Sequence, residues 1–198
     1  MISGNFIDQL TETSTNLSKL IVCLTGMPGA GKSTIADGLK SKGFVVINMG
    51  DAVRAEAKKR NLEPTGQNLG KLMLELREKN GPAIVAELIL PQITNSNSNV
   101  LVIDGIRSNH EIEVFKKAGT VKLLLIEATT DTRFKFLRDR GRTDDPKTRD
   151  VFDERDKREA RVGLSDSITL ADQSISNNNL TKDELVESAF NLIQSWVH

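Results

Sequence analysis

The sequence has little cysteine, no long apolar segment and no excess of charge of either sign. Its one cysteine, Cys23, excludes an intrachain disulfide and favours a reducing compartment, so we expect a cytoplasmic protein. No stretch reaches the roughly 20 apolar residues of a membrane span, which argues against a membrane protein. The 27 basic and 27 acidic side chains give a formal net charge of zero, so the chain as a whole has no electrostatic attraction to nucleic acid.

The signatures of several other protein classes are also missing. No cluster of cysteine and histidine indicates zinc, and no arrangement of serine, histidine and aspartate indicates hydrolysis. The first residues have neither the cationic segment nor the apolar stretch of a secretory signal. Residues 1–18 are rich in Ser, Thr and Asn, and we expect a polar N-terminal extension or an extra helix ahead of one domain at 19–198.

What the sequence does contain is an alternation of short apolar runs with longer amphipathic stretches. The apolar runs are residues 20–25, 44–48, 100–104 and 121–127, and a helical pattern follows each of them. The runs are continuously hydrophobic, as strands buried on both faces of a sheet must be. The alternation predicts an α/β fold in which helices cover both faces of a parallel sheet. Residues 49–92 show only helical patterns, which predicts a helical insert after the second strand.

A glycine-rich loop follows the first predicted strand. It reads Gly26-Met27-Pro28-Gly29-Ala30-Gly31-Lys32-Ser33, and a helical pattern begins at Thr34. This is the G-x-x-x-x-G-K-[ST] pattern between a strand and a helix. Glycines let successive backbone N–H groups converge on a polyphosphate, and the helix points its positive end at the same charge. We therefore expect the loop to bind ATP, with Lys32 reaching the β- and γ-phosphates and Thr34 supporting the start of the helix.

The same site needs oxygen ligands for the Mg²⁺ ion that bridges the phosphates. We expect Ser33 to supply a hydroxyl and Asp104, which ends the third apolar run, to supply a carboxylate, either directly or through water. The alternative for Asp104 is that it caps the helix that follows.

Arginines follow three of the later elements. The segments are Gly50-Asp51-Ala52-Val53-Arg54, Asp104-Gly105-Ile106-Arg107 and Arg138-Asp139-Arg140-Gly141-Arg142-Thr143-Asp144-Asp145. Arg54 and Arg107 follow strands at the edge of the sheet where α/β proteins bind ligands. Arginine presents a fixed fork of donors that suits phosphate oxygens. For any single arginine of the third segment, a salt-bridged surface helix is an equally good interpretation.

Together these segments resemble adenylate kinase and related nucleoside monophosphate kinases, over residues 19–197. The whole pattern is most similar to a little-characterised archaeal family of adenylate-kinase-related proteins. The resemblance implies a three-layer α/β/α P-loop NTPase fold with a five-stranded parallel sheet, a helical acceptor-binding insert and a short lid at 138–164. It also implies that Arg54 and Arg107 hold the acceptor phosphate, although Asp-Gly-Ile-Arg is one residue shorter than the family's usual Asp-Gly-Phe-Pro-Arg.

The resemblance extends to the lid and to the end of the sheet. Arg138 and Arg142 are similar to the arginines at the lid hinge of adenylate kinases, one against the ATP base and one on its phosphates. Arg142-x-Asp144-Asp145 resembles the arginine and acid pair that closes the lid, and Arg155 lies near the place of a further phosphate-directed arginine. Residues 171–177, ending at Asn177, resemble the last strand and adenine-side loop of these kinases and of dephospho-CoA kinases. By composition, residues 131–161 hold 11 basic and 9 acidic side chains and few apolar ones, which predicts a mobile, solvated lid.

These observations lead to one hypothesis with two rivals. We expect an ATP- and Mg²⁺-dependent kinase, a monomer or small homo-oligomer, that phosphorylates a nucleoside monophosphate with Lys32, Arg54, Arg107, Arg138 and Arg142 as its catalytic residues. The first rival is dephospho-CoA kinase or another small-molecule kinase. The second rival is an adenylate-kinase-like ATPase that acts in assembly or regulation with a macromolecular partner.

Overall fold

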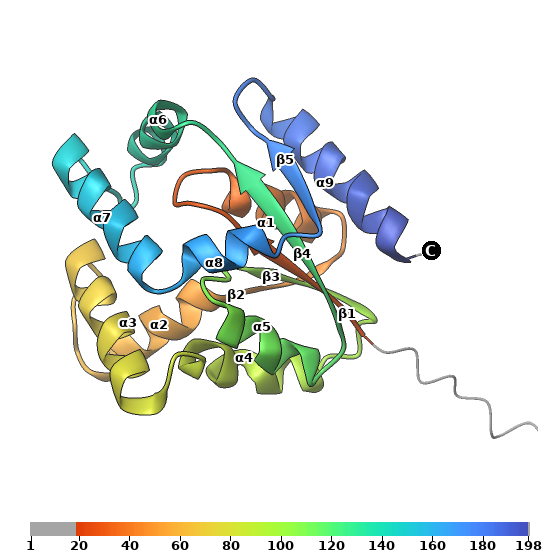
Figure 1. The fold of residues 1–198 in the computed structure, drawn as a ribbon, viewed down its shortest axis with the longest axis horizontal. Coiled ribbons are helices and arrows are strands. Elements are labelled where there is room, and N and C mark those ends of the chain that lie inside the picture. Colours follow the sequence, from red (N-terminus) through yellow and green to blue (C-terminus); the bar gives the residue numbers. More distant parts are fainter. Residues whose placement is uncertain (1–18, 198) are drawn as a thin grey trace, which may run out of the picture.

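Five parallel strands form the centre of the molecule (Figure 1). They are β1 (Leu20–Thr25), β2 (Val45–Asn48), β3 (Val100–Asp104), β4 (Thr120–Glu127) and β5 (Gln173–Ser176), in the spatial order β2-β3-β1-β4-β5. The structure is a computed structural model that describes residues 19–197, so the expected extension at 1–18 lies outside the described residues. The predicted five-stranded parallel sheet is confirmed, and two of its strands begin one residue away from the expected position.

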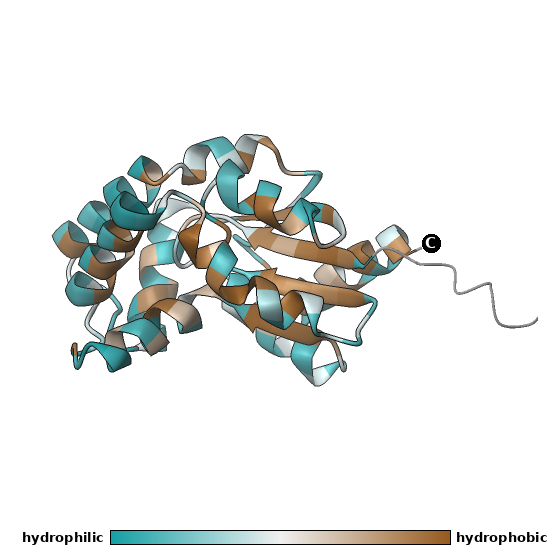
Figure 2. Ribbon diagram, turned by 90° about the horizontal axis from the view of Figure 1, so that it is seen from below, coloured by the Kyte–Doolittle hydropathy of each residue, from teal (hydrophilic) through white to brown (hydrophobic). Residues whose placement is uncertain are grey.

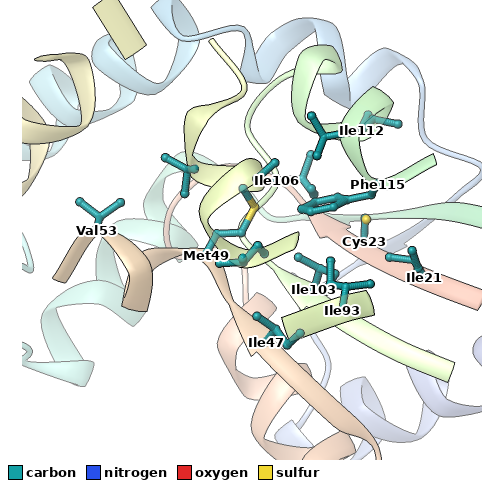
Figure 3. Close-up of a cluster of buried hydrophobic side chains, with 14 of the residues drawn as sticks. Ile21, Cys23, Ile47, Met49, Val53, Ile93, Ile103, Ile106, Ile112 and Phe115 are labelled. Atoms are coloured by element: carbon teal, nitrogen blue, oxygen red, sulfur yellow. The ribbon is translucent and has the colours of Figure 1, made fainter. Parts of the chain in front are cut away.

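The side chains of β1 alternate between two hydrophobic cores. Ile21 and Cys23 pack into one core, and Val22 and Leu24 pack into the other, all of them fully buried. The first core lies against α2 (Met49–Lys59), α3 (Gly66–Asn80), α4 (Ile84–Thr94) and α5 (Asn109–Lys116). The second lies against α1 (Lys32–Ser41) and α9 (Lys182–Val197). Figure 2 shows the apolar strands between helices, and Figure 3 shows Cys23 beside Ile21 and Phe115 in the first core.

Local sequence signals set the boundaries of the helices after β2. The side chain of Asn48 accepts a hydrogen bond from the Gly50 backbone at 2.8 Å and starts α2. Thr65 caps α3 in the same way, through the Asn68 backbone at 3.2 Å. Gly81, with a φ of 96°, ends that helix in a conformation that other residues rarely adopt. The predicted stretch without strands between β2 and β3 is therefore three helices.

The segment after β4 is better anchored than its composition predicts. It folds into α6 (Thr130–Arg140), α7 (Arg149–Arg161) and α8 (Leu164–Thr169). Phe152 is fully buried, its ring 5.4 Å from that of Phe134 and beneath the guanidinium of Arg133. Charged side chains of this segment are also buried, among them Arg133 and Glu159. The expectation of a solvated segment with little to hold it is therefore wrong for these positions, because one aromatic side chain and buried ion pairs replace an aliphatic core.

None of the helices within residues 19–197 is long and apolar enough to cross a membrane.

Candidate active site

A cleft of about 600 Å³ opens at the carboxyl ends of the strands. The predicted site residues that line it are Gly26, Pro28, Gly29, Gly31, Lys32, Ser33, Thr34, Arg54, Asp104, Arg107, Arg142, Arg155 and Asn177. They come from the loop after β1, from the segments after β2 and β3, and from the region after β4. The structure therefore brings the glycine-rich loop, Arg54 and Arg107 to one cavity.

Glycine is required in the loop by close approaches as well as by its backbone angles. A Cβ atom on Gly26, whose φ is 134°, would lie 2.2 Å from the backbone oxygen of Ile126 in β4. One on Gly31, whose φ is 114°, would lie 2.5 Å from the side-chain nitrogen of Asn177. Gly31 is also the residue that precedes α1, and no side chain caps that helix. The N–H groups of its first turn are thus available to a phosphate.

Asn177 and Arg133 hold the backbone of the glycine-rich loop through hydrogen bonds. Asn177 is buried and donates from Nδ2 to the backbone oxygen of Ala30 at 2.9 Å. Arg133 of α6 donates to the backbone oxygen of Pro28 at 3.0 Å and forms a two-pronged ion pair with Asp156. Asn177 lines the cleft as predicted, but its amide fixes the shape of the loop. Met27 and Ala30 contribute backbone to the loop, and their side chains do not line the cleft within the described structure.

Lys32 folds back onto the loop that precedes it. Its Nζ donates to the backbone oxygens of Gly26 at 2.5 Å and Met27 at 3.1 Å. Burial lowers the pKa of Lys32 to about 8, an effect that the negative charge of Asp104 partly opposes. A phosphate group would replace the two carbonyl oxygens as a stronger, charged partner.

An ATP analogue should bind less tightly as the pH rises through about 8. The free protein loses the Lys32 proton near that pH, whereas the phosphate-bound lysine keeps it. Binding must therefore take up a proton above the pKa of the free protein, and affinity falls by up to about tenfold per pH unit. Calorimetric titrations in two buffers of different ionisation enthalpy would measure this uptake, which should approach one proton at about pH 9.5 and vanish near pH 7. An affinity that stays constant over this range would contradict the assignment.

Asp104 lies at the centre of a small oxygen-rich cluster. Its Oδ2 accepts hydrogen bonds from Asn48 Nδ2 at 2.8 Å and from Ser33 Oγ at 3.4 Å. Burial raises the pKa of Asp104, although Lys32 and Arg107 act in the opposite direction. One carboxylate and one hydroxyl are the protein ligands that Mg²⁺ prefers when phosphate oxygens and water complete its shell. The donor set therefore fits the predicted ion, which Ser33 and Asp104 would hold.

Asn48 is a site residue that the sequence analysis did not identify. The register of the sheet pairs Asn48 with Asp104, so the two side chains meet at the ends of β2 and β3. Asn48 also caps α2, as described above, and its two roles use the two ends of one amide. An asparagine before a helix is usually explained by capping alone. The sequence therefore gives no reason to expect the additional contact of Asn48 with Asp104.

Arg107 is held by two carboxylates that reach it from different elements. Its Nε donates to Glu159 of α7 at 2.7 Å, and its backbone N–H donates to Glu111 of α5 at 2.7 Å. The charge of Glu159 raises the pKa of Arg107. Burial by itself opposes ionisation of Glu159, but Arg107 and Arg155 hold the pKa of that carboxyl below its usual range. Arg107 thus remains charged and fixed at the wall of the cleft, and it links the lid to β3.

Arg54 faces the same cavity from α2. It forms an ion pair with Asp51, three residues earlier, at 2.7 Å, and about a third of its side chain is exposed. Such an exposed pair is worth about 0–1 kcal/mol, so a ligand phosphate can compete for the guanidinium.

The structure separates the arginines at the end of α6. Arg142 lines the cleft, as predicted, whereas within the described residues Arg138 is not part of its wall. Arg138 is exposed, with Asp139 3.9 Å away as its ion-pair partner. The residues of this segment that line the cleft are Lys135, Phe136, Leu137, Asp139 and Arg140, so the side chain of Arg138 turns away from a wall that both of its neighbours reach. The predicted contact of Arg138 with the nucleotide would need a movement of this segment.

Asp144 and Asp145 are paired with the side chains of Arg140 and Arg155, whereas the resemblance implied Arg142. Asp145 is paired with Arg140, and its Oδ2 also accepts from the Arg142 backbone at 2.9 Å. Arg155 donates to the backbone oxygen of Asp144 at 3.1 Å and lies 3.6 Å from the Asp145 carboxylate. Arg155 lines the cleft. Its position in the sequence alone did not decide whether it would reach the site.

Comparison with known proteins places the chain in a family. A family model described as an AAA domain matches residues 25–153. A UPF0200 protein of Hyperthermus butylicus is 39% identical over 175 residues, which cover 88% of this chain and 94% of the relative. The chain belongs to the UPF0200 family. Another UPF0200 protein, from Pyrococcus abyssi, is 41% identical over 165 residues, 81% of this chain and 88% of the relative. The predicted similarity to an archaeal family of P-loop kinases is thus confirmed.

Solved structures agree on the fold of this UPF0200 protein. The crystal structure of TT1252 from Thermus thermophilus superimposes with a TM-score of 0.65 at 17% identity, over 91% of this chain and 99% of that one. Shikimate kinase from Acinetobacter baumannii, in complex with shikimate, gives a TM-score of 0.56 at 18% identity, over 90% and 94% of the two chains. At such low identity the likeness establishes the α/β P-loop kinase fold and leaves the acceptor open.

Proposed function

We propose that this protein transfers the γ-phosphoryl group of ATP to a nucleoside monophosphate. One observation carries the proposal. The walls of a single cleft contain both the glycine-rich loop with Lys32 and the residues Arg54 and Arg107. Hydrolysis of ATP needs the loop and at most an arginine at the transferring group, whereas a kinase also needs cations that hold the acceptor phosphate.

The residues of the cleft would act mainly by position and charge. Lys32 and the backbone N–H groups of the loop hold the donor phosphates, and Arg54 and Arg107 hold the acceptor phosphate in line with them. Mg²⁺, held by Ser33 and Asp104, neutralises charge on the phosphates when it is bound. Phosphoryl transfer requires little covalent participation from protein side chains, so alignment and charge compensation supply most of the rate enhancement.

The lid contributes the remaining cations. Arg142 and Arg155 reach the cavity from the segment after β4, where they can cover the transferring group. Exclusion of water by such a cover limits wasteful hydrolysis of ATP. We also propose that the protein works in the cytoplasm on a small-molecule acceptor, as a monomer or small homo-oligomer, and needs neither a membrane nor nucleic acid.

A screen of acceptors tests the proposal directly. ATP or GTP is mixed with Mg²⁺ and with nucleoside monophosphates, deoxynucleoside monophosphates, dephospho-CoA or shikimate, the ligand named for the similar Acinetobacter structure. Mass spectrometry identifies the product. We expect a nucleoside diphosphate. Phosphorylation of dephospho-CoA or shikimate alone would replace the proposal with another kinase activity, and ATP hydrolysis that depends on a macromolecular partner and yields no phosphorylated acceptor would replace it with an ATPase.

A further inference from the structure

A second, smaller cavity adjoins the cleft between α2, α3 and α7. Its volume is about 60 Å³, and it shares Arg54, Arg107 and Arg155 with the wall of the cleft. A single water needs about 10–15 Å³ of such space, so the cavity suits the edge of a ring with one attached oxygen. The side chains of Val53, Leu69, Met73 and Val85 give it apolar walls.

Unpartnered hydrogen-bond donors gather at this cavity. Among the described residues, five buried side-chain nitrogen and oxygen atoms have no hydrogen-bond partner. Four of the five belong to residues that line this cavity: Nε and Nη1 of Arg77, Nε of Arg155 and Nε of Arg158. The Arg77 side chain is only 9% exposed. Buried polar groups are normally hydrogen-bonded, so this concentration of free donors indicates a missing partner.

The missing partner need not carry a negative charge. Arg77 is paired with Glu111 at 2.7 Å, and Arg107 is paired with Glu159 at the same distance. Arg155 has the Asp145 carboxylate at 3.6 Å. The charges of Arg77 and Arg107 are therefore balanced, Arg155 shares Asp145 with Arg140, and Arg158 has no ion pair among the described residues. Most of the positive charge at the cavity is thus compensated, and what the cavity lacks is hydrogen-bond acceptor atoms.

The chemistry of arginine restricts which acceptor atoms can fill the cavity. A guanidinium group can only donate hydrogen bonds. An amino group placed there would put donors against donors, whereas a carbonyl oxygen or an unprotonated ring nitrogen would accept. Arginine makes such contacts with the O6 and N7 atoms of guanine in nucleic-acid recognition. The apolar walls suit the faces of the same planar ring.

We infer that this cavity binds the base edge of the acceptor nucleotide and selects bases that carry an oxo group over bases that carry an amino group. The inference rests on the proposed function, which places the acceptor phosphate at Arg54 and Arg107. Arg77 and Arg158 then become residues that determine the base specificity of the reaction.

Two matched pairs of acceptors test the inference. IMP and AMP differ at purine position 6, where IMP has an oxo and AMP an amino group, and at the adjacent N1, which carries a hydrogen only in IMP. UMP and CMP differ in the same two ways at pyrimidine C4 and N3, so the pairs test the contact with the exocyclic group. Because hydrogen bonds to charged donors are strong, we expect kcat/KM to favour IMP over AMP, and UMP over CMP, by about ten- to a hundredfold. Equal kcat/KM values within both pairs, or a preference for the amino bases, would overturn the inference.

Variants of the cavity should reduce this ratio without loss of the fold. Arg77→Lys keeps a positive charge beside Glu111 but removes the free Nε and Nη1 donors. Arg158→Met keeps the apolar stem of a side chain that lines the cavity from α7. Both should bring the IMP to AMP ratio close to one. Lys157→Met is the control, because this neighbour is exposed on the same helix and should leave the ratio unchanged.

Gly70→Ala separates specificity from stability. A Cβ atom on Gly70 would lie 2.8 Å from the Arg158 guanidinium carbon, so the guanidinium must move. Alanine favours a helix more than glycine does, and the melting temperature should stay equal or rise. A lower IMP to AMP ratio in a protein of undiminished stability would support the inference, and an unchanged ratio would contradict the role of Arg158.

The acceptor screen and a binding measurement together test the base selectivity separately from the proposed function. If all nucleoside monophosphates are phosphorylated equally well, the function stands and the selectivity is wrong. If none is phosphorylated, the function fails, and calorimetric binding of IMP and AMP then decides the selectivity separately. Equal binding of the two in that experiment would overturn the inference as well.

Discussion

Replacement of Lys32 by alanine should reduce phosphoryl transfer by about a thousandfold or more. Loss of one preorganised donor at a developing charge costs about 10²–10³ in turnover, and Lys32 supplies a full positive charge as well. Its position in the cleft, folded onto the Gly26 and Met27 carbonyl oxygens, places it where the donor phosphates would enter. The measurement is kcat in the coupled assay, with the acceptor that the screen identifies.

The fold should not suffer from this replacement. Lys32 is a partly buried cation whose hydrogen-bond partners are backbone oxygens of its own loop. Its removal takes one favourable charge from the buried carboxyl of Asp104, on which Arg107 still acts. We therefore expect the melting temperature of Lys32→Ala to stay close to that of the unmodified protein. Lys40→Ala is the matched control, since Lys40 is exposed in the last turn of the same helix. Turnover by Lys32→Ala within tenfold of the unmodified protein would remove the loop from the mechanism.

The parts of the site that the sequence could predict are those encoded within a few consecutive residues. The glycine-rich loop from Gly26 to Ser33 depends on local backbone angles and on the helix that follows it. Arg54 and Arg107 follow strands, and the carboxyl ends of parallel strands meet at one edge. Their approach to the loop follows from the topology alone, and Asp104 lies in the cluster for the same reason.

The parts that sequence could not predict are contacts between distant segments. Glu159 meets Arg107 across 52 positions of the chain, and Arg133 meets Pro28 across 105. Many acidic side chains of α7 could be the partner of Arg107, and only the placement of α7 beside the loop after β3 selects Glu159. Arg138 illustrates the same limit, because its place in the lid motif says nothing about which side of α6 faces the cleft.

The pair of Arg107 and Glu159 should separate stability from catalysis. Arg107→Ala leaves Glu159 buried, with its side chain only 5% exposed, and without its nearest cation. Removal of one partner of a buried ion pair costs about 3–5 kcal/mol, and because Arg155 still acts on Glu159 we expect the lower end of that range, which for a domain of this size corresponds to a fall in melting temperature of roughly 10 °C. The variant should also lose acceptor binding, because the guanidinium on the cleft wall is gone. Thermal unfolding and the KM for the acceptor measure the two effects.

The double variant Arg107→Ala with Glu159→Gln decides which effect matters for turnover. A neutral amide in place of the Glu159 carboxylate removes the unpaired charge, so most of the lost stability should return. Turnover should not return, because no cation replaces Arg107 at the acceptor phosphate. Recovery of both would mean that Arg107 acts only as a structural link between β3 and the lid. Recovery of stability alone would show that Glu159 positions the guanidinium of Arg107, and that this guanidinium binds the acceptor.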